Sequence, residues 1–431
     1  MGGISMEWKE VRLGDVCEIK GGKRLPKGIN LITQKNSHPY IRVRDLGKSK
    51  TLELNSSYEY VDEITQKQIQ RYITLKGDIL ISIVGTIGLI AIVGGSLNGA
   101  NLTENCVKLV KLDNIDSEYL YYYLKSPLGQ QNISRGTVGA VQAKLPIKNI
   151  QEFNINCPVL ISDQRRIASI LSSLDRKIEL NNKINADLEE MAQAIFKNWF
   201  VDFEPFKDGK FVDSELGMIP EGWKVGSYSE MIESLISGDW GKETLQGNYT
   251  HEVACVRGCD FQDINNGVRG KTPQRYILEK NYQAKHLKDK DILVEISGGT
   301  ATVSTGRTSL VTEELLKKYK HDIVCTNFCK VLRPLSQFSS YVYYSWKYKY
   351  DNDIMFGYEN GTSGIKNFAI KDFIEKEPVL IPKEQDIVEF QKIIDNLQKQ
   401  KQIKGTENTT LSTLRDTLLP RLMSGEIEVP E

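Results

Sequence analysis

The chain lacks the features of a protein that enters or crosses a membrane. No stretch approaches the ~18 consecutive apolar residues of a membrane helix, and the segment Met1 to Glu7 has no apolar core of signal-peptide length. Cysteine is scarce: seven scattered residues, an odd number, favour a reducing compartment over a disulfide framework. We therefore expect a cytoplasmic protein with no membrane partner.

Net charge and catalytic motifs are also missing. The 56 basic residues balance 56 acidic ones, so any surface for nucleic acid has to be a local patch. The histidines His38, His286 and His321 stand apart from any acid or nucleophile pattern. Gly270-Lys271-Thr272 matches the end of a phosphate-binding loop motif, but Asn265 occupies the position of the first glycine of that motif. We predict no catalytic residue and no cofactor.

What the chain does contain is a repeat, with a second copy beginning about 215 residues after the first. This period is too long for a solenoid, whose units run to roughly 20 to 50 residues, so it indicates a duplicated domain. The matching pairs are Trp8 and Trp223, Asp78-Ile79-Leu80 and Asp291-Ile292-Leu293, Asn105 and Asn327, Lys108 and Lys330, the tyrosine runs 119–123 and 341–344, Gly136 and Gly361, and the Pro-Val-Leu-Ile strings at 158–161 and 378–381.

Each copy is predicted to be an α+β module. Residues 78–84 and 89–93 have the apolar character of two buried strands around a glycine turn, and residues 291–296 begin the same plan in the second copy. The tyrosine runs lack strict alternation and follow serines, which favours helices. Two similar modules can be related by a pseudo-two-fold axis, which suits a reader of two DNA half-sites.

A long helix is expected after each module. Apolar residues recur at a 3.5-residue spacing, except at two central asparagines in the first helix, Asn181 and Asn185, and at a polar centre in the second. We predict that the helices pair as an antiparallel coiled coil in which the polar centres meet; two separate amphipathic helices are the alternative. Gly405 predicts fraying or a kink in the second helix.

Three segments resemble a known family. Phe196 to Phe206, Asp213 to Trp223 and Leu418 to Ile427 are similar to conserved-region signatures of the specificity subunits (HsdS) of type I restriction-modification systems. The resemblance implies two tandem target-recognition domains separated by two long conserved helices. It places the first recognition domain at residues 1–157, the first conserved helix region at 158–206, a linker at 207–222, the second recognition domain at 223–377 and the second conserved helix region at 378–431.

The same resemblance implies a non-catalytic reader of bipartite double-stranded DNA with an unread spacer. Its expected partners are two methyltransferase subunits and, in the full complex, restriction subunits. The alternative is a free-standing two-domain DNA-binding protein, a repressor or a decoy, without catalytic partners. From Asp163 to Asp202 the first helix would span ~60 Å at ~1.5 Å per residue, enough to separate two recognition domains by about one DNA turn of ~34 Å.

Candidate DNA contacts are basic and small polar residues near glycine loops, where lysine and arginine can neutralise phosphate and arginine can read guanine. In the first copy they are Lys20, Lys23, Arg24, Arg42, Arg44, Thr86, Thr137, Gln142 and Lys144. In the second copy they are Trp240, Lys242, Arg257, Thr300, Arg307, Thr362, Ser363, Lys366 and Asn367.

Two further groups of residues have open interpretations. Trp199, Phe200, Phe203 and Phe206 are predicted to contact a methyltransferase subunit, with packing inside the chain as the alternative. His251, Cys255, Cys259, Cys325 and Cys329 have four-residue spacings that could suit zinc. We expect no metal, because the repeat aligns Cys259 with Arg44, Cys325 with Thr103 and Cys329 with Val107.

Overall fold

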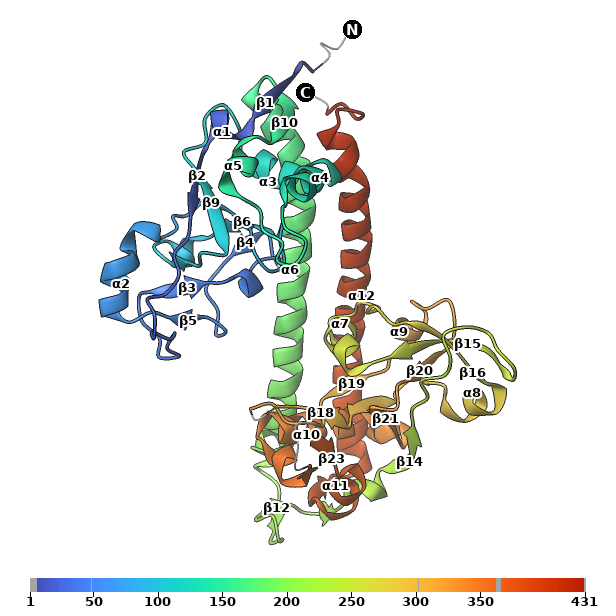
Figure 1. Cartoon of the computed structure of the whole chain (residues 1–431). Helices are drawn as coiled ribbons and strands as arrows, with labels where there is room; N and C mark the ends of the chain where they lie inside the picture. The colour runs from blue at the N-terminus through green and yellow to red at the C-terminus, as the bar shows by residue number, and fades with distance from the viewer. Residues whose placement is uncertain (1–5, 48, 301, 362–365, 430–431) are drawn as a thin grey trace. The chain divides into compact units, whose positions relative to one another are not determined.

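The computed structural model describes residues 6–47, 49–300, 302–361 and 366–429. They form two compact units, Met1–Lys177 with Leu411–Glu431, and Ile178–Thr410 (Figure 1). Both units combine sheets and helices, so the predicted α+β architecture is confirmed. Within the described ranges, no helix has both the length and the apolar character that a membrane span requires.

The first unit contains short strands and helices followed by the start of a long helix. Its strands are β1 Trp8–Arg12, β2 Glu18–Gly21, β3 Pro39–Ile41, β4 Thr51–Leu52, β5 Glu59–Tyr60, β6 Ile79–Ser82, β7 Ile90–Val93, β8 Asn101–Leu102, β9 Cys106–Val110 and β10 Asn154–Pro158. Its helices are α1 Leu13–Val16, η1 Val43–Asp45, α2 Glu63–Ile69, η2 Gln70–Tyr72, η3 Gly95–Leu97, α3 Ser117–Lys125, α4 Pro127–Gly136 and α5 Ile147–Gln151.

A five-stranded sheet in the order β2-β9-β6-β7-β4 forms the centre of this unit. Strands β6 and β7 pair antiparallel around the predicted glycine turn. Ile79, Leu80 and Ile81 of β6 are fully buried, which explains why this segment is continuously apolar rather than alternating. A three-stranded sheet, β5-β3-β8, and the pair β1-β10 complete the unit.

The second unit contains the matching elements. Its strands are β11 Phe211–Val212, β12 Ile219–Pro220, β13 Lys224–Gly226, β14 Ile232–Ser237, β15 Tyr249–Val256, β16 Gln274–Leu278, β17 Ile292–Glu295, β18 Ser297–Gly298, β19 Thr308–Leu310, β20 Ile323–Cys325, β21 Cys329–Pro334, β22 Glu359–Asn360, β23 Lys366–Phe368 and β24 Val379–Ile381. Its shorter helices are η4 Glu204–Phe206, η5 Tyr228–Glu230, η6 Gly258–Asp260, α7 Phe261–Asn265, α8 Glu279–Lys285, α9 Glu313–Leu316, η7 Ser336–Phe338, α10 Ser339–Asp351, η8 Ile354–Tyr358 and α11 Ile370–Lys376.

Sheet topology confirms the duplication. The order β14-β21-β17-β19 repeats β2-β9-β6-β7, and β16-β15-β20 repeats β5-β3-β8. In both three-stranded sheets the central strand has one antiparallel and one parallel neighbour. The pair β13-β24 repeats β1-β10. The tyrosine runs form α3 and α10, as predicted, and both helices are largely buried.

Two 40-residue helices, α6 Ile161–Phe200 and α12 Glu384–Met423, each contribute residues to both units. In the second unit α6 and α12 pair antiparallel, since Asn181 hydrogen-bonds to Asn408 at 2.9 Å, Glu189 forms an ion pair with Lys401, and Phe196 lies against Phe390. In the first unit the pairing has the same sense (Figure 1). There Ile167 and Leu171 share a core with Leu422, and Asp175 forms a 2.7 Å ion pair with Arg415. The predicted antiparallel pairing is confirmed.

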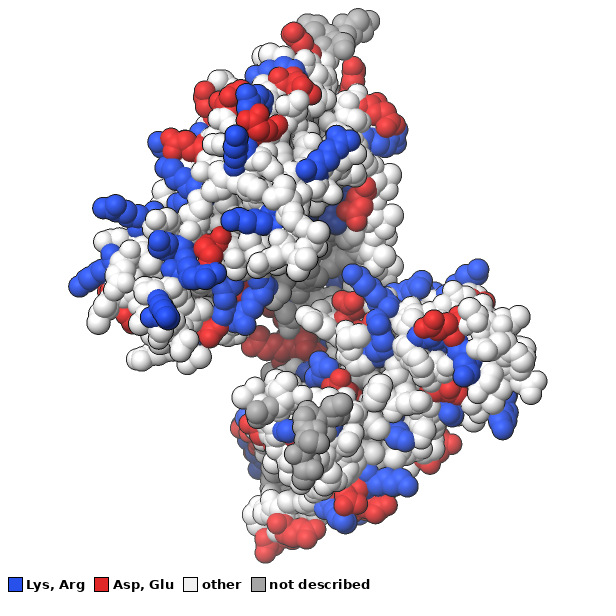
Figure 2. All heavy atoms as spheres, viewed as in Figure 1, with Lys and Arg blue, Asp and Glu red and all other residues white. Residues whose placement is uncertain are grey.

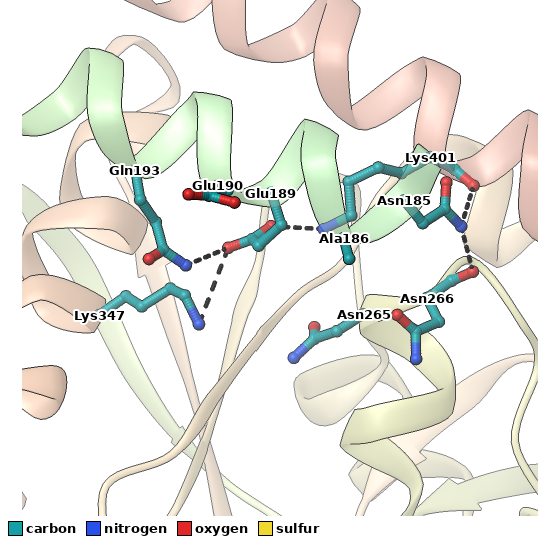
Figure 3. Close-up of a pocket in the computed structure, with 9 residues that line it drawn as sticks. All are labelled: Asn185, Ala186, Glu189, Glu190, Gln193, Asn265, Asn266, Lys347 and Lys401. Atoms are coloured by element: carbon teal, nitrogen blue, oxygen red, sulfur yellow. Dashed lines mark hydrogen bonds and ion pairs between the residues drawn. The ribbon is translucent and has the colours of Figure 1, made fainter. Parts of the chain in front are cut away.

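The polar centres of the two helices meet in the second unit, as expected. Figure 3 shows Asn185 of α6 donating hydrogen bonds to the backbone oxygens of Asn266 and Lys401, at 2.9 and 3.3 Å. Lys401 is 3 % exposed and forms its ion pair with Glu189. Burial raises the pKa of Glu189, but Lys401 and Lys347 outweigh this effect and hold it below the usual value. A small pocket of about 280 Å³ lies beside these groups.

Helix α12 continues through Gly405, so the predicted fraying is wrong. The helix continues from Glu384 to Met423, and a Cβ at Gly405 would overlap the backbone oxygen of Gly267. Gly267 has a positive φ of +74°, and a Cβ there would lie 2.5 Å from the backbone oxygen of Lys401. Two glycines thus allow the loop after α7 to touch the helix backbone, so Gly405 serves packing and not flexibility.

Candidate nucleic-acid interface

Residues from two of the predicted loop groups converge in the first unit. A hollow of about 820 Å³ is lined by the end of β2, the segment after β6, the turn before β9 and the loop between α4 and α5. Predicted contacts Arg24, Gln142 and Lys144 line it, together with Glu104 and Asn105, which the sequence analysis did not select. An open, polar hollow of this size can receive the edge of another macromolecule.

Backbone hydrogen bonds fix these loops to one another. Lys23 donates its backbone N–H to Leu102 at 2.8 Å, which ties the β2 loop to β8. Lys144 forms β-bridges with both Val84 and Val138, and Leu145 donates to Ile83 at 3.0 Å. The α4–α5 loop is therefore anchored to the end of β6.

Gly22 and Gly238 have matching structural roles in the two units. A Cβ at Gly22 would overlap the backbone oxygen of Thr103, and a Cβ at Gly238 would overlap that of Thr326. Both glycines allow a strand end to cross the turn before β9 or β21. The absence of a side chain at these positions permits this close crossing.

Charge in the hollow is partly neutralised by the chain itself. Arg24 is 80 % exposed in its side chain and donates to Glu104 at 2.7 Å. Burial raises the pKa of Glu104, but hydrogen bonds from Arg24 and Thr103 more than offset it, so the pKa lies below its usual value. Lys144 and Gln142 are exposed at the rim.

The remaining candidates of the first unit lie outside the lining of this hollow. Thr86 is exposed in the turn between β6 and β7, two residues after the lining residue Val84. Lys20 forms an ion pair with Glu18 at 2.8 Å. Thr137 donates its hydroxyl to the backbone of Ile133. Arg42 and Arg44 both form ion pairs with Glu59.

In the second unit, the predicted arginines are also held by carboxylates. Arg257 donates to both oxygens of Asp260, at 3.0 and 3.1 Å. Arg307 donates to both oxygens of Glu295, at 2.8 Å each. The Arg275 guanidinium lies 3.8 Å from the ring centroid of Trp240, and the Lys242 ammonium lies 5.5 Å from that of Tyr249. Lys366 forms a 2.7 Å ion pair with Glu359. Thr300 is exposed in the turn after β18, and Asn367 is exposed on β23. Thr362 and Ser363 lie outside the described residues.

Acidic and basic side chains are interspersed over the visible face of each unit (Figure 2). This distribution agrees with the zero net charge of the chain. It means that a nucleic-acid surface here depends on particular loops and not on one broad basic face.

Strand register corrects the repeat alignment by one residue. In β9, Gly21 is opposite Val107 and Leu80 is opposite Lys108. In β21, Ser237 is opposite Lys330 and Leu293 is opposite Val331. The equivalents of Cys106, Lys108 and Asn105 are therefore Cys329, Val331 and Phe328. The predicted pairings of Asn105 with Asn327, Lys108 with Lys330, Cys325 with Thr103 and Cys329 with Val107 are wrong.

This correction changes the argument about zinc. Because Cys106 matches Cys329, one thiol does recur in both copies. Cys255, Cys325 and Cys329 are buried, whereas Cys259 is exposed, and burial raises the pKa of Cys106 and Cys329 to about 12. In the described part of the chain, no three His, Cys, Asp or Glu residues are grouped closely enough to hold a metal ion.

The four aromatic residues proposed for partner contact pack within the second unit. Phe200 is 3 % exposed and lies against Tyr341, with ring centroids 4.8 Å apart. Phe203 and Phe206 both contact Trp223, and Trp199 contacts Phe206. Packing inside the chain thus accounts for Phe200, while Trp199, Phe203 and Phe206 are only partly buried. Contact of these residues with a partner stays a prediction.

Comparison with known proteins matches this duplicated architecture. Residues 6–190 match the family described as "Type I restriction modification DNA specificity domain". The chain resembles type I restriction specificity subunits. The type I restriction enzyme MjaIX specificity subunit of Methanocaldococcus jannaschii is 28% identical, over 100% of this chain and 96% of its own. The HindI specificity subunit of Haemophilus influenzae is 26% identical, over 66% of this chain and 71% of its own.

A solved specificity subunit has the same fold. The crystal structure of the S subunit of the type I restriction-modification system from M. genitalium matches with a TM-score of 0.54 at 16% identity, covering 99% of this chain and 97% of the other. The resemblance to specificity subunits indicated by the three sequence segments is confirmed.

Proposed function

We propose that this chain is the DNA specificity subunit of a type I restriction-modification complex. In this role it reads a bipartite double-stranded site with an unread spacer, each unit reading one half, and it recruits two methyltransferase subunits and, in the full complex, restriction subunits. It performs no catalysis alone. The recognition domains correspond to residues 1–157 and 223–377.

One observation carries most of the proposal. The loops that contain Arg24, Gln142 and Lys144 come from distant parts of the first unit, yet they line one open hollow. Lysine and arginine can neutralise phosphates, and glutamine can pair with the edge of adenine, so this hollow combines the two kinds of contact that DNA reading needs. The similarity to specificity subunits over the whole chain supports the same function.

Binding by the full chain, alone and co-expressed with methyltransferase subunits, tests the proposal. We expect selection from a randomised duplex pool to yield two short sequences separated by a spacer of fixed length. Affinity should fall steeply with salt concentration, because phosphate neutralisation releases counterions. Co-expression should add methyl groups to both halves of the same site. Sequence-independent binding in both preparations, or methylation without a bipartite consensus, would refute the proposal.

A further inference from the structure

Equivalent turns before β9 and β21 present different side chains on the same backbone frame. Cys106 donates its backbone N–H to Thr103 at 3.1 Å, and Cys329 donates to Thr326 at 3.0 Å. Inside each turn the threonine hydroxyl accepts the backbone N–H of the third residue, which is Asn105 in one unit and Phe328 in the other. The two turns therefore have the same internal hydrogen bonds.

The third residue of each turn is also fixed from outside. Ile83 donates to the backbone oxygen of Asn105 at 2.8 Å, and Ile296 donates to that of Phe328 at 2.9 Å. Gly22 and Gly238 press against the threonines of the two turns. A side chain carried by this rigid frame leaves the backbone at a defined place, which a base-reading residue requires.

The two side chains differ in the chemistry they offer. Asn105 lines the hollow of the first unit. Among the described residues its backbone N–H bonds to Thr103, but its side-chain amide makes no hydrogen bond. Phe328 is 65% exposed, although burying a phenylalanine in the core stabilises a protein by roughly 1.5–3 kcal/mol. An amide with a free donor and acceptor can pair with adenine in the major groove, whereas an apolar ring can contact the 5-methyl group of thymine.

We propose that Asn105 and Phe328 are equivalent specificity-determining residues, Asn105 reading an adenine in one half-site and Phe328 contacting a thymine methyl group in the other. This assignment rests on the proposed function and extends it to named positions. The two half-sites then differ at this position because the residue on a common turn differs.

Base analogues give a direct test with the full chain and its selected site. Replacing the contacted thymine by deoxyuridine removes only the methyl group, and replacing the contacted adenine by 7-deaza-adenine removes only the N7 acceptor. We expect the wild-type chain to bind more weakly when one particular thymine or one particular adenine is replaced. The loss should be about fivefold or more for the adenine, which pairs with the amide through two hydrogen bonds. Phe328→Ala should lose sensitivity to deoxyuridine alone, and Asn105→Ala should lose sensitivity to 7-deaza-adenine alone.

Each variant serves as the control for the other half-site. Leu335→Ala adds a matched control, because Leu335 is 38% exposed at the opposite end of β21 and should leave both sensitivities unchanged. Retained deoxyuridine sensitivity in Phe328→Ala, or an equal loss of affinity for all sequences, would overturn the assignment while leaving the proposed function intact. If the wild-type chain selected no sequence at all, the proposed function would fail and the assignment with it.

Discussion

At the scale of single residues, all five predicted DNA-binding arginines already have an acidic partner. Arg24, Arg257 and Arg307 donate to Glu104, Asp260 and Glu295. A phosphate must therefore compete with a carboxylate for each guanidinium. This arrangement holds the side chains in place before binding, but it reduces the net attraction for DNA.

Glu104→Gln tests this competition at the most exposed of the three pairs. The substitution removes a negative charge and frees Arg24, so we expect tighter DNA binding and a salt dependence steeper by up to about 0.9 in log affinity against log salt concentration. Stability should change little, because exposed ion pairs contribute ~0–1 kcal/mol. Titration at several salt concentrations measures the effect. Glu152→Gln, which removes the partner of Arg12 outside the hollow, should leave binding unchanged; an equal effect there would point to net charge alone.

Lys318 predicts a pH effect on stability. Burial lowers its pKa to about 8, and its ammonium donates to Gly267 and Gln402. Between pH 8 and the ordinary lysine value of 10.5, the unfolded chain keeps a proton that the folded chain has lost, so the free energy of unfolding should rise with pH. The rise should be smaller than the full pKa shift would give, because the side chain is partly exposed and solvent screens it.

Lys318→Met should remove this rise, which denaturant titrations at pH 7.5 and 10 can measure. The exposed neighbour Lys320 provides the control, since in Lys320→Met the free energy of unfolding should rise with pH as in the wild type. If the free energy of unfolding changed equally with pH in all three proteins, Lys318 would not be the cause of the rise.

At the scale of elements, the contact between α12 and the loop after α7 should reverse the usual effect of replacing glycine by alanine in a helix. Glycine inside a helix usually costs about 1 kcal/mol relative to alanine, so Gly405→Ala would be expected to stabilise α12. Because the new Cβ would overlap the backbone of Gly267, we expect a loss of about 1–3 kcal/mol instead.

Thermal or denaturant unfolding would measure the sign of this change. Thr406→Ala, at the exposed neighbouring position, should be close to neutral. If Gly405→Ala proved more stable than the wild type, the close approach of Gly267 would be contradicted.

The elements also show what local sequence patterns can and cannot predict. Buried strands, tyrosine helices and the polar centre of the helix pair follow from patterns within one segment, and all were predicted. The equivalence of Asn105 and Phe328 was missed because the identical Asn327 offered a false anchor, and only strand register decides between alignments one residue apart. The Arg24–Glu104 pair spans 80 positions, so no local pattern reveals it.

At the scale of the whole molecule, the proposed spacer between half-sites depends on α6 and α12. Both helices cross the boundary between the units, after Lys177 in one and after Thr410 in the other. A seven-residue insertion at both points would leave each compact unit intact. Seven residues preserve the face of a paired helix, because they complete almost two turns.

Such a double insertion would lengthen the helix pair by ~10.5 Å, or about three base pairs at ~3.4 Å each. We expect methylome sequencing, in cells that also express the methyltransferase subunits, to find both original half-sites with a longer spacer. Loss of methylation is the other result consistent with a rigid ruler, because added base pairs also rotate one half-site around the DNA axis. An insertion in α6 alone breaks the register with α12 and should abolish activity. If the double insertion methylated the original site at the original rate, the helices would not set the spacer, and the distance between half-sites would have to be fixed by the partner subunits.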